Sequence, residues 1–231
     1  MHLRSRCTAA LCAVVVWSVF SCPIVGRPRA VSAADWKPAP CPLMTPWGER
    51  LDPEHVWPEY PRPMMVRDEW ANLNGLWQFE FIDEAKRPDD IPFGRDLEGR
   101  ILVPFPWESA LSGIRKFHPQ GRAWYRRTFR VPETWTGKRI LLNFEAVDWE
   151  CAVFVDGEYA GGHRGGYDPF SIDITDDLAD RDTHELLVYV YDPGSDRPIA
   201  RGKQSNGKFD DPQGFSYTPS SGIWQTVWLE P

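Results

Sequence analysis

Side chains able to contact a ligand gather in three segments of the 231-residue chain. They are the bend VPFPWESAL at 103–111, the glycine-rich stretch GGHRGGYD at 161–168 and the polar stretch at 203–216. Each combines glycine or proline with polar or aromatic residues, a composition typical of ligand-binding loops carried by a rigid scaffold. The candidate substrate-binding residues are Trp107, Glu108, His163, Arg164, Tyr167, Asp210 and Asp211.

Glu108 is the carboxylate that invites a catalytic interpretation, and Trp107 beside it could line a groove with it. Hydrolysis of a glycoside with retention needs two carboxyl groups about 5 to 5.5 Å apart, one of them with a raised pKa. No second carboxylate stands at a recognisable spacing from Glu108. We therefore expect Glu108 to cap or hydrogen-bond nearby groups, and we assign no catalytic residue, no metal ligand and no cofactor.

The glycines between 161 and 166 predict a loop, because glycine adopts positive φ angles that other side chains disfavour. His163, Arg164 and Tyr167 would project from this loop toward a ligand. It stays equally open that these side chains only cap carbonyls of the sheet and hold the loop against the core. The acidic pair at 210 and 211 has the simpler alternative of forming the solvated tip of a loop.

Short strands must carry these segments. Runs of β-branched and aromatic residues follow one another from residue 77 onward, bounded by Gly, Pro, Asp and Asn. Within them Ile140, Leu142 and Phe144 share one face, and this period of two indicates a strand. Asp156-Gly157 predicts a tight hairpin between two runs. The predicted strands are 77–81, 101–105, 123–131, 139–147, 151–155, 171–175, 185–191 and 223–230.

This pattern predicts an all-β fold, an antiparallel jelly-roll β-sandwich. A doubly wound α/β fold is excluded, because no segment between the runs has the helical pattern that parallel crossovers need. We expect residues of period two to be buried between the two sheets. These are Ile140, Leu142, Phe144, Val188, Val190, Val227 and Leu229.

The amino-terminal segment predicts export to the periplasm or the extracellular space. Arg4 and Arg6 precede an apolar run at 7–25, and small residues follow at 31–34, as in a signal peptide. The apolar run is too interrupted for a spanning helix, so no membrane contact is expected after cleavage. A lipid anchor on Cys22 is the weaker alternative. The predicted organisation is 1–34 signal peptide, 35–63 proline-rich extended arm and 64–231 jelly-roll domain.

Composition narrows the class of partner. A net charge of -7 and a pI near 5.3 exclude a nucleic-acid partner, which would require a basic face. The chain has 12 tryptophans, whose indole suits ligands with apolar faces and polar edges, such as sugars, although most of them can equally fill a core. Only Cys41 and Cys151 follow the predicted leader, and we favour a free buried thiol at Cys151 over a bridge.

Four segments match one family in order and spacing. They are NLNGLWQFEF at 72–81, VPFPWESALSGI at 103–114, the long run 123–175 and YTPSSGIWQTVWLEP at 217–231. They resemble the amino-terminal sugar-binding domain of family 2 glycoside hydrolases, the β-galactosidase, β-glucuronidase and β-mannosidase group. The resemblance implies a sandwich of the galactose-binding-domain type that binds a β-glycoside.

The resemblance does not assign substrate-contacting residues to this chain. Its galactosidase branch contacts substrate through an asparagine where this chain has Pro106 and an aspartate where it has Gly165, and its glucuronidase branch uses an aspartate that aligns near Ser216. These substrate contacts are therefore not carried over. The catalytic glutamates of the family lie on a (β/α)₈ barrel, a fold of about 250 residues, so we expect the 231 residues to be inactive by themselves.

Three functions follow as expectations. The first is the non-catalytic sugar-binding domain of a family 2 hydrolase, present without its barrel. The second is a lectin-like carbohydrate-binding module that acts alone, and the third is an interaction subunit that docks a separately encoded barrel. An open half-site without the barrel predicts weak sugar binding, with a dissociation constant no tighter than about 1 mM, whereas micromolar binding would favour the lectin-like module.

Overall fold

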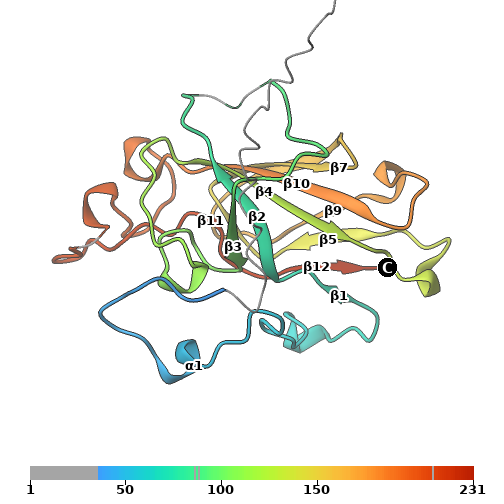
Figure 1. Ribbon diagram of the computed structural model, residues 1–231, viewed down its shortest axis with the longest axis horizontal. Coiled ribbons are helices and arrows are strands. Elements are labelled where there is room, and N and C mark those ends of the chain that lie inside the picture. The colour runs from blue at the N-terminus through green and yellow to red at the C-terminus, as the bar shows by residue number, and fades with distance from the viewer. Residues whose placement is uncertain (1–35, 86, 88, 210) are drawn as a thin grey trace, which may run out of the picture.

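The computed structural model describes residues 36–85, 87, 89–209 and 211–231, and the predicted signal peptide lies outside them. Two antiparallel sheets pack face to face (Figure 1). The larger sheet has the order β3 (Gly99–Val103), β2 (Gly75–Phe81), β4 (Arg122–Phe129), β10 (His184–Tyr191), β7 (Glu150–Val155) and β8 (Glu158–Arg164). The smaller has the order β1 (Ala71–Asn72), β12 (Val227–Glu230), β5 (Leu141–Phe144) and β9 (Phe170–Asp173). The predicted antiparallel sandwich is confirmed.

A two-stranded ribbon and several short helices complete the fold. The ribbon pairs β6 (Val147–Asp148) with β11 (Gly222–Ile223). The helices are α1 (Pro46–Glu49), η2 (Pro63–Met65), η3 (Ala110–Ser112), η4 (Glu133–Trp135), η5 (Thr175–Asp177), η6 (Gly194–Asp196) and η7 (Asn206–Lys208). In the part of the chain that the structure describes, no helix has the length and apolar character needed to cross a bilayer.

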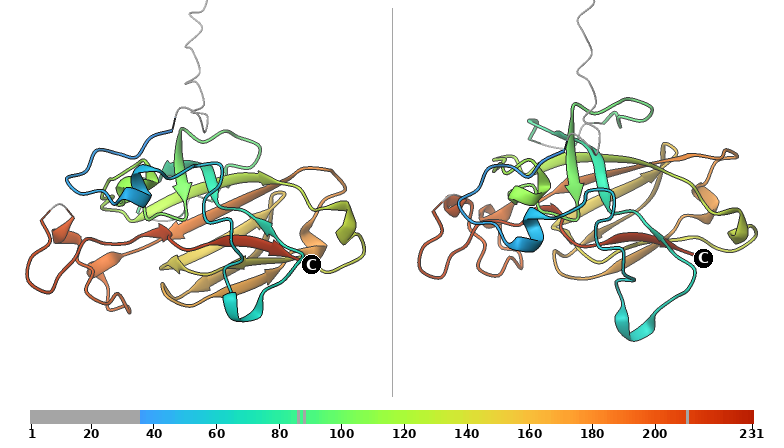
Figure 2. Two further views of the ribbon diagram at one scale, coloured as in Figure 1. Left: turned by 90° about the horizontal axis from the view of Figure 1, so that it is seen from below. Right: turned by 60° about the horizontal axis from the view of Figure 1, so that its bottom comes forward.

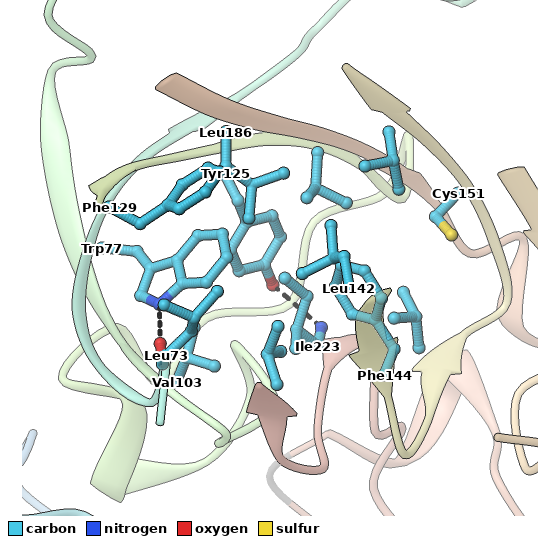
Figure 3. Close-up of a cluster of buried hydrophobic side chains, with 14 of the residues drawn as sticks. Leu73, Trp77, Val103, Tyr125, Phe129, Leu142, Phe144, Cys151, Leu186 and Ile223 are labelled. Carbon is cyan, nitrogen blue, oxygen red and sulfur yellow. Dashed lines mark hydrogen bonds between the residues drawn. The ribbon is translucent and has the colours of Figure 1, made fainter. Parts of the chain in front are cut away.

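The core lies between the two sheets, where alternate residues of facing strands meet (Figure 3). All seven residues predicted for it are at most 2% exposed, which confirms the period-two interpretation. Two buried polar atoms of the core are hydrogen-bonded: Trp77 Nε1 donates to the Leu73 carbonyl at 2.8 Å, and Tyr125 Oη accepts from Ile223 N at 3.4 Å. Cys151 is a free, buried thiol, as predicted, and Cys41 is free as well.

The hairpin from β7 to β8 turns at Asp156-Gly157, as predicted. Both residues have positive φ angles, 50° and 95°, which the tight turns of twisted hairpins require. The Asp156 carboxylate accepts hydrogen bonds from Glu185 N at 2.9 Å and Ala179 N at 3.1 Å, and it contacts His184 Nδ1 at 2.7 Å. The turn is therefore anchored to the start of β10.

The glycine-rich segment is mostly a strand, which corrects the predicted loop. Gly161 and Gly162 belong to β8, and only Gly165, of the four glycines, has a positive φ angle, at 143°. Close packing explains the glycines: a Cβ on Gly162 would lie 2.6 Å from the Cys151 carbonyl oxygen, and one on Gly161 would lie 3.1 Å from Ile172. The glycines thus let β8 approach its neighbours, a role that Gly plays in strands as well as in turns.

Residues 36–70 hold only α1 and η2, and they run along one side of the sandwich (Figure 1). Val56 anchors this arm, since it is 2% exposed and packs with Leu102 and Phe105. Asn72 Nδ2 donates to the carbonyls of Val56 at 3.1 Å and Trp57 at 2.9 Å. The arm is therefore bound to the edge where β1 begins.

Candidate functional site

A cavity of about 280 Å³ lies at one end of the sandwich, and we call it the end cavity. The segment between β10 and β11, orange to red in Figures 1 and 2, projects from this end, opposite the carboxyl terminus, and forms much of the wall. Such positions suit ligand contacts, because loops can vary while the sheets hold them in place. The lining residues are Asp148, Tyr167, Arg201, Lys203, Gln204, Tyr217, Thr218, Ser220 and Trp224.

Gln204 connects the walls of the end cavity. Its Nε2 donates to Asp148 Oδ2 at 2.8 Å and to Tyr167 Oη at 3.2 Å, while its Oε1 accepts from Ser220 N at 2.5 Å. The backbone beside it is held too, because Tyr217 N donates to the Lys203 carbonyl at 2.9 Å. One amide side chain thus joins four segments that are far apart in the sequence.

Asp148 supplies a carboxylate with unused hydrogen-bonding capacity. It ends β6, where pairing with Gly222 places it beside β11, and it is 1% exposed. Its Oδ2 is bonded to Gln204, but its Oδ1 is shielded from solvent and has no partner among the described residues. Burial, followed by the charge of Asp192, raises the pKa of Asp148. A hydrogen-bonding group on a ligand would satisfy the remaining oxygen.

Two further acidic residues, Glu108 and Asp192, are buried, and the charge of Asp192 acts on both Asp148 and Glu108. Glu108 is 5% exposed and accepts from Ser221 N at 3.0 Å and Ser221 Oγ at 2.8 Å. Burial raises the pKa of Glu108 to about 7 against the lowering effect of these bonds. Burial also raises the pKa of Asp192, which accepts from Gly194 N at 2.6 Å. Burial thus shifts both carboxyls toward their neutral form, as expected of carboxyls with little solvent.

Aromatic rings and cations form the outer part of the wall. Trp224 is fixed by donation from Nε1 to the Gly166 carbonyl at 2.8 Å, and Tyr167 meets its ring edge to face at 6.1 Å. Tyr167 is 48% exposed and so remains available to a ligand. Lys203 Nζ lies 5.7 Å from the Tyr217 ring centre, and Arg201 Nε donates to the Gln204 carbonyl at 3.2 Å. The described residues form no cluster of three or more His, Cys, Asp or Glu suited to a metal ion.

An aromatic wall with a buried carboxylate and an amide suits a polyhydroxylated ligand. Similarity to known proteins points to the same class of ligand. The sequence profile of the family described as "Glycosyl hydrolases family 2, sugar binding domain" matches residues 103–227, more than half of the chain.

The chain belongs to glycosyl hydrolase family 2.

Curated relatives within the family include a β-galactosidase of Thermoanaerobacter pseudethanolicus, 33% identical over 47% of this chain and 13% of that protein. A β-glucuronidase of Paenibacillus borealis is 28% identical over 50% of this chain and 20% of that protein. Among solved structures, a β-glucuronidase from Ruminococcus gnavus in complex with N1-substituted uronic isofagomine has a TM-score of 0.53 at 21% identity, covering 74% of this chain and 31% of that one. That likeness shows the shared fold.

This family 2 chain corresponds to the sugar-binding domain of the family, and it spans 13–20% of the length of the curated relatives that it matches. The described residues form antiparallel sheets and contain no (β/α)₈ barrel. The catalytic glutamates that the resemblance places on such a barrel therefore have no counterpart among them.

The structure corrects the predicted placement of Trp107 and Glu108 in this family 2 domain. Trp107 is 1% exposed and packs against Phe79 and Phe81, and Glu108 is buried against Ser221. Neither side chain is among the residues that line the end cavity. The expectation that Glu108 hydrogen-bonds nearby groups is confirmed.

The other predicted residues lie on the strand β8, in the connection from β8 to β9 and in the loop before β11. Tyr167 lines the end cavity. His163 stacks on Phe170 with 4.4 Å between ring centres, and Arg164 pairs with Glu150 at 3.1 Å, so both are engaged along β8. Asp211 is exposed and accepts from Gln213 in the loop before β11, and Asp210 lies outside the described residues. Whether any of these side chains contacts a sugar stays a prediction.

Sequence reasoning missed Asp148, Gln204 and Trp224 as members of one site. Gln204 fell within the predicted 203–216 segment, but nothing distinguished it from its polar neighbours. Asp148 follows a strand pattern, and Trp224 alternates with core residues in the last strand pattern, so both resembled ordinary sheet residues. The one usable signal was the position of Asp148, a polar residue at the end of a strand pattern, because functional groups are frequent at such positions.

Proposed function

We propose that this domain binds a sugar of a β-glycoside through its end cavity and presents it to catalytic residues outside the described chain. The observation that carries this proposal is the shielded Asp148 Oδ1, which has no hydrogen-bond partner among the described residues and belongs to a cavity bounded by Tyr167 and Trp224. Sugar hydroxyls both donate and accept hydrogen bonds, and sugar ring faces are apolar enough to contact aromatic rings. Gln204 fixes the relative positions of these groups, which lowers the cost of binding.

The charge of the end cavity favours an acidic sugar. Arg201 and Lys203 line it, while Asp148 is held toward its neutral form by burial, so the cavity carries positive charge toward a ligand. A uronate carboxylate would pair with the two cations. Curated relatives named β-glucuronidase agree with this assignment.

For the whole protein, we propose a role as the accessory domain of an exported family 2 β-glycosidase. The family match and the amino-terminal pattern at 1–34 support it. A carbohydrate-binding module acting alone remains the second candidate, which the intact strand set favours. Activity assays of the purified chain with and without a separately produced family 2 barrel distinguish the two.

Titration of ¹⁵N-labelled protein with glucuronate, galactose and mannose tests the end cavity. We expect glucuronate to bind best, with a dissociation constant of about 1 mM, because an open site buries little of the sugar. Tyr167→Ala should weaken binding of glucuronate at least fivefold. Tyr159→Ala is a matched control, since Tyr159 is 61% exposed on β8 and outside the cavity lining. Equal weakening by both variants, or no binding of any of the three sugars, would contradict the proposal.

A further inference from the structure

A second and larger cavity lies between the arm and the smaller sheet. Its volume is about 500 Å³, and we call it the arm cavity. Arm residues Trp57 and Tyr60 form one wall, and Glu145 with Trp224 forms another. Glu145 follows β5, and its backbone N–H donates to the Thr226 carbonyl at 2.9 Å, which ties this wall to the strand connection before β12.

The aromatic walls of the arm cavity are fixed before any ligand arrives. The Trp57 carbonyl is bound by Asn72 Nδ2 at 2.9 Å, and the Trp57 ring meets Phe105 edge to face at 5.5 Å. Tyr60 Oη donates to Glu230 Oε1 at 2.5 Å. Trp57 is still 44% exposed, so its ring has a free surface. Preformed rings of this kind bind with little loss of conformational entropy.

Glu145 gives the arm cavity an unsatisfied acceptor. Its Oε2 is shielded from solvent and has no hydrogen-bond partner among the described residues. A shielded carboxylate oxygen without a donor is costly, and native structures usually satisfy such atoms with a ligand, water or protein group. A ligand hydroxyl would supply the donor.

The charge of the arm cavity differs from that of the end cavity. Glu59 and Glu145 line it, and none of its described lining residues is basic. A uronate would be repelled there, whereas a neutral sugar offers hydroxyl donors and an apolar ring face. Trp224 lines both cavities, so the two cavities are neighbours.

We propose that the arm cavity is a second sugar subsite that takes a neutral pyranose, next to the acidic sugar of the end cavity. The proposal rests on the proposed function, because it assumes that the domain binds carbohydrate. It gives the proline-rich arm a direct role in recognition: Trp57 stacks on the ring, and the Glu145 carboxylate accepts from its hydroxyls. A glycan that joins an uronic and a neutral residue would then fill both cavities.

Titration of [¹⁵N-indole]tryptophan-labelled full chain with methyl β-glucoside, and separately with glucuronate, tests the arm cavity. Methyl β-glucoside should shift the indole signals of Trp57 and Trp224. Glu145→Gln, which keeps the shape of the side chain, and Trp57→Ala should each weaken this binding at least tenfold. Trp47→Ala is the matched control on the arm, because Trp47 is 76% exposed and outside the cavity, and it should leave binding unchanged.

The two proposals fail in different ways. If glucuronate binding responds to Tyr167→Ala while methyl β-glucoside binding ignores both Glu145→Gln and Trp57→Ala, the arm subsite is refuted and the end cavity stands. If glucuronate does not bind but methyl β-glucoside binds and responds to the arm variants, the end-cavity assignment fails alone. Tetramethylammonium that shifts Trp57 at lower concentration than methyl β-glucoside would show a cation site and overturn the neutral-sugar assignment.

Discussion

Replacing Glu108 by glutamine should make the protein less sensitive to alkaline pH. In the folded protein burial raises the pKa of Glu108 from 4.5 to about 7, so the carboxyl stays protonated over a range in which the unfolded chain has already released its proton. The folded state then binds more protons than the unfolded state, and stability falls as pH rises. The contribution is fully present below pH 4.5 and is lost as pH rises through about 7.

The size of the effect follows from the pKa. At 1.36 kcal/mol for each pH unit, the shift of Glu108 corresponds to about 3 kcal/mol of unfolding free energy. Glutamine resembles the protonated acid: its oxygen can accept from Ser221 N, and its amide can donate to Ser221 Oγ. Between pH 4.5 and 8 the stability of Glu108→Gln relative to the natural protein should therefore rise by about 3 kcal/mol.

Urea unfolding followed by tryptophan fluorescence at intervals of pH measures this difference directly. Asp148 and Asp192 have pKa values raised in the same direction, so the variant should keep part of the downward slope. Glu133→Gln serves as the control, since Glu133 is exposed on η4 and is hydrated in both states. A stability difference between Glu108→Gln and the natural protein that stays constant within about 1 kcal/mol over this range would refute the reasoning.

Three further predictions concern the core, the end cavity and catalysis. Leu142→Ala should lower the unfolding free energy by about 2 to 5 kcal/mol, because Leu142 is fully buried between the sheets. A loss below about 1 kcal/mol in urea unfolding would contradict this, because it would mean that neighbouring side chains fill the space left by Leu142. Gly166→Ala should lower the unfolding free energy by about 2 kcal/mol or more and weaken glucuronate binding, because the new Cβ would lie 2.4 Å from Asp148 Oδ1. Gly207→Ala is the control: a Cβ there would have no atom within 4 Å, so this variant should be neutral in the same assays. The purified chain should leave nitrophenyl β-galactoside, β-glucuronide and β-mannoside uncleaved, since the described residues lack the family's barrel; turnover above buffer that Glu108→Gln abolishes would prove this wrong.

Much of the fold was predictable because the patterns that indicate strands and turns depend on residues that are neighbours in the sequence. Alternation at Ile140, Leu142 and Phe144 depends only on neighbours in the sequence, and it was sufficient to place these residues between the sheets. The hairpin turn at Asp156-Gly157 was equally predictable from the sequence, since the turn requires two residues that tolerate positive φ angles. The free thiol at Cys151 followed from its place in a strand pattern.

The glycine-rich segment shows where local information became ambiguous. Glycine serves both a turn, where it supplies positive φ, and a tightly packed strand, where a Cβ would collide with a neighbour. Gly162 belongs to the second case because the Cys151 carbonyl lies against it across the β7–β8 pair. Nothing within 161–166 itself distinguishes the two cases.

The site depended on contacts that only the tertiary structure creates. Gln204 is hydrogen-bonded to Asp148, 56 residues away in the sequence, and Glu108 to Ser221, 113 residues away. No sequence spacing pattern predicts contacts between residues so far apart. Pairing of β6 with β11 decides that Asp148 faces the end cavity, and the segment that returns to β11 decides that Glu108 is covered. The sequence by itself predicted most of the strands, because hydrophobic alternation is a property of neighbours, but it missed β8, whose glycines it assigned to a loop. The folded chain alone decided which polar groups share a cavity, because that depends on how distant strand ends are brought together.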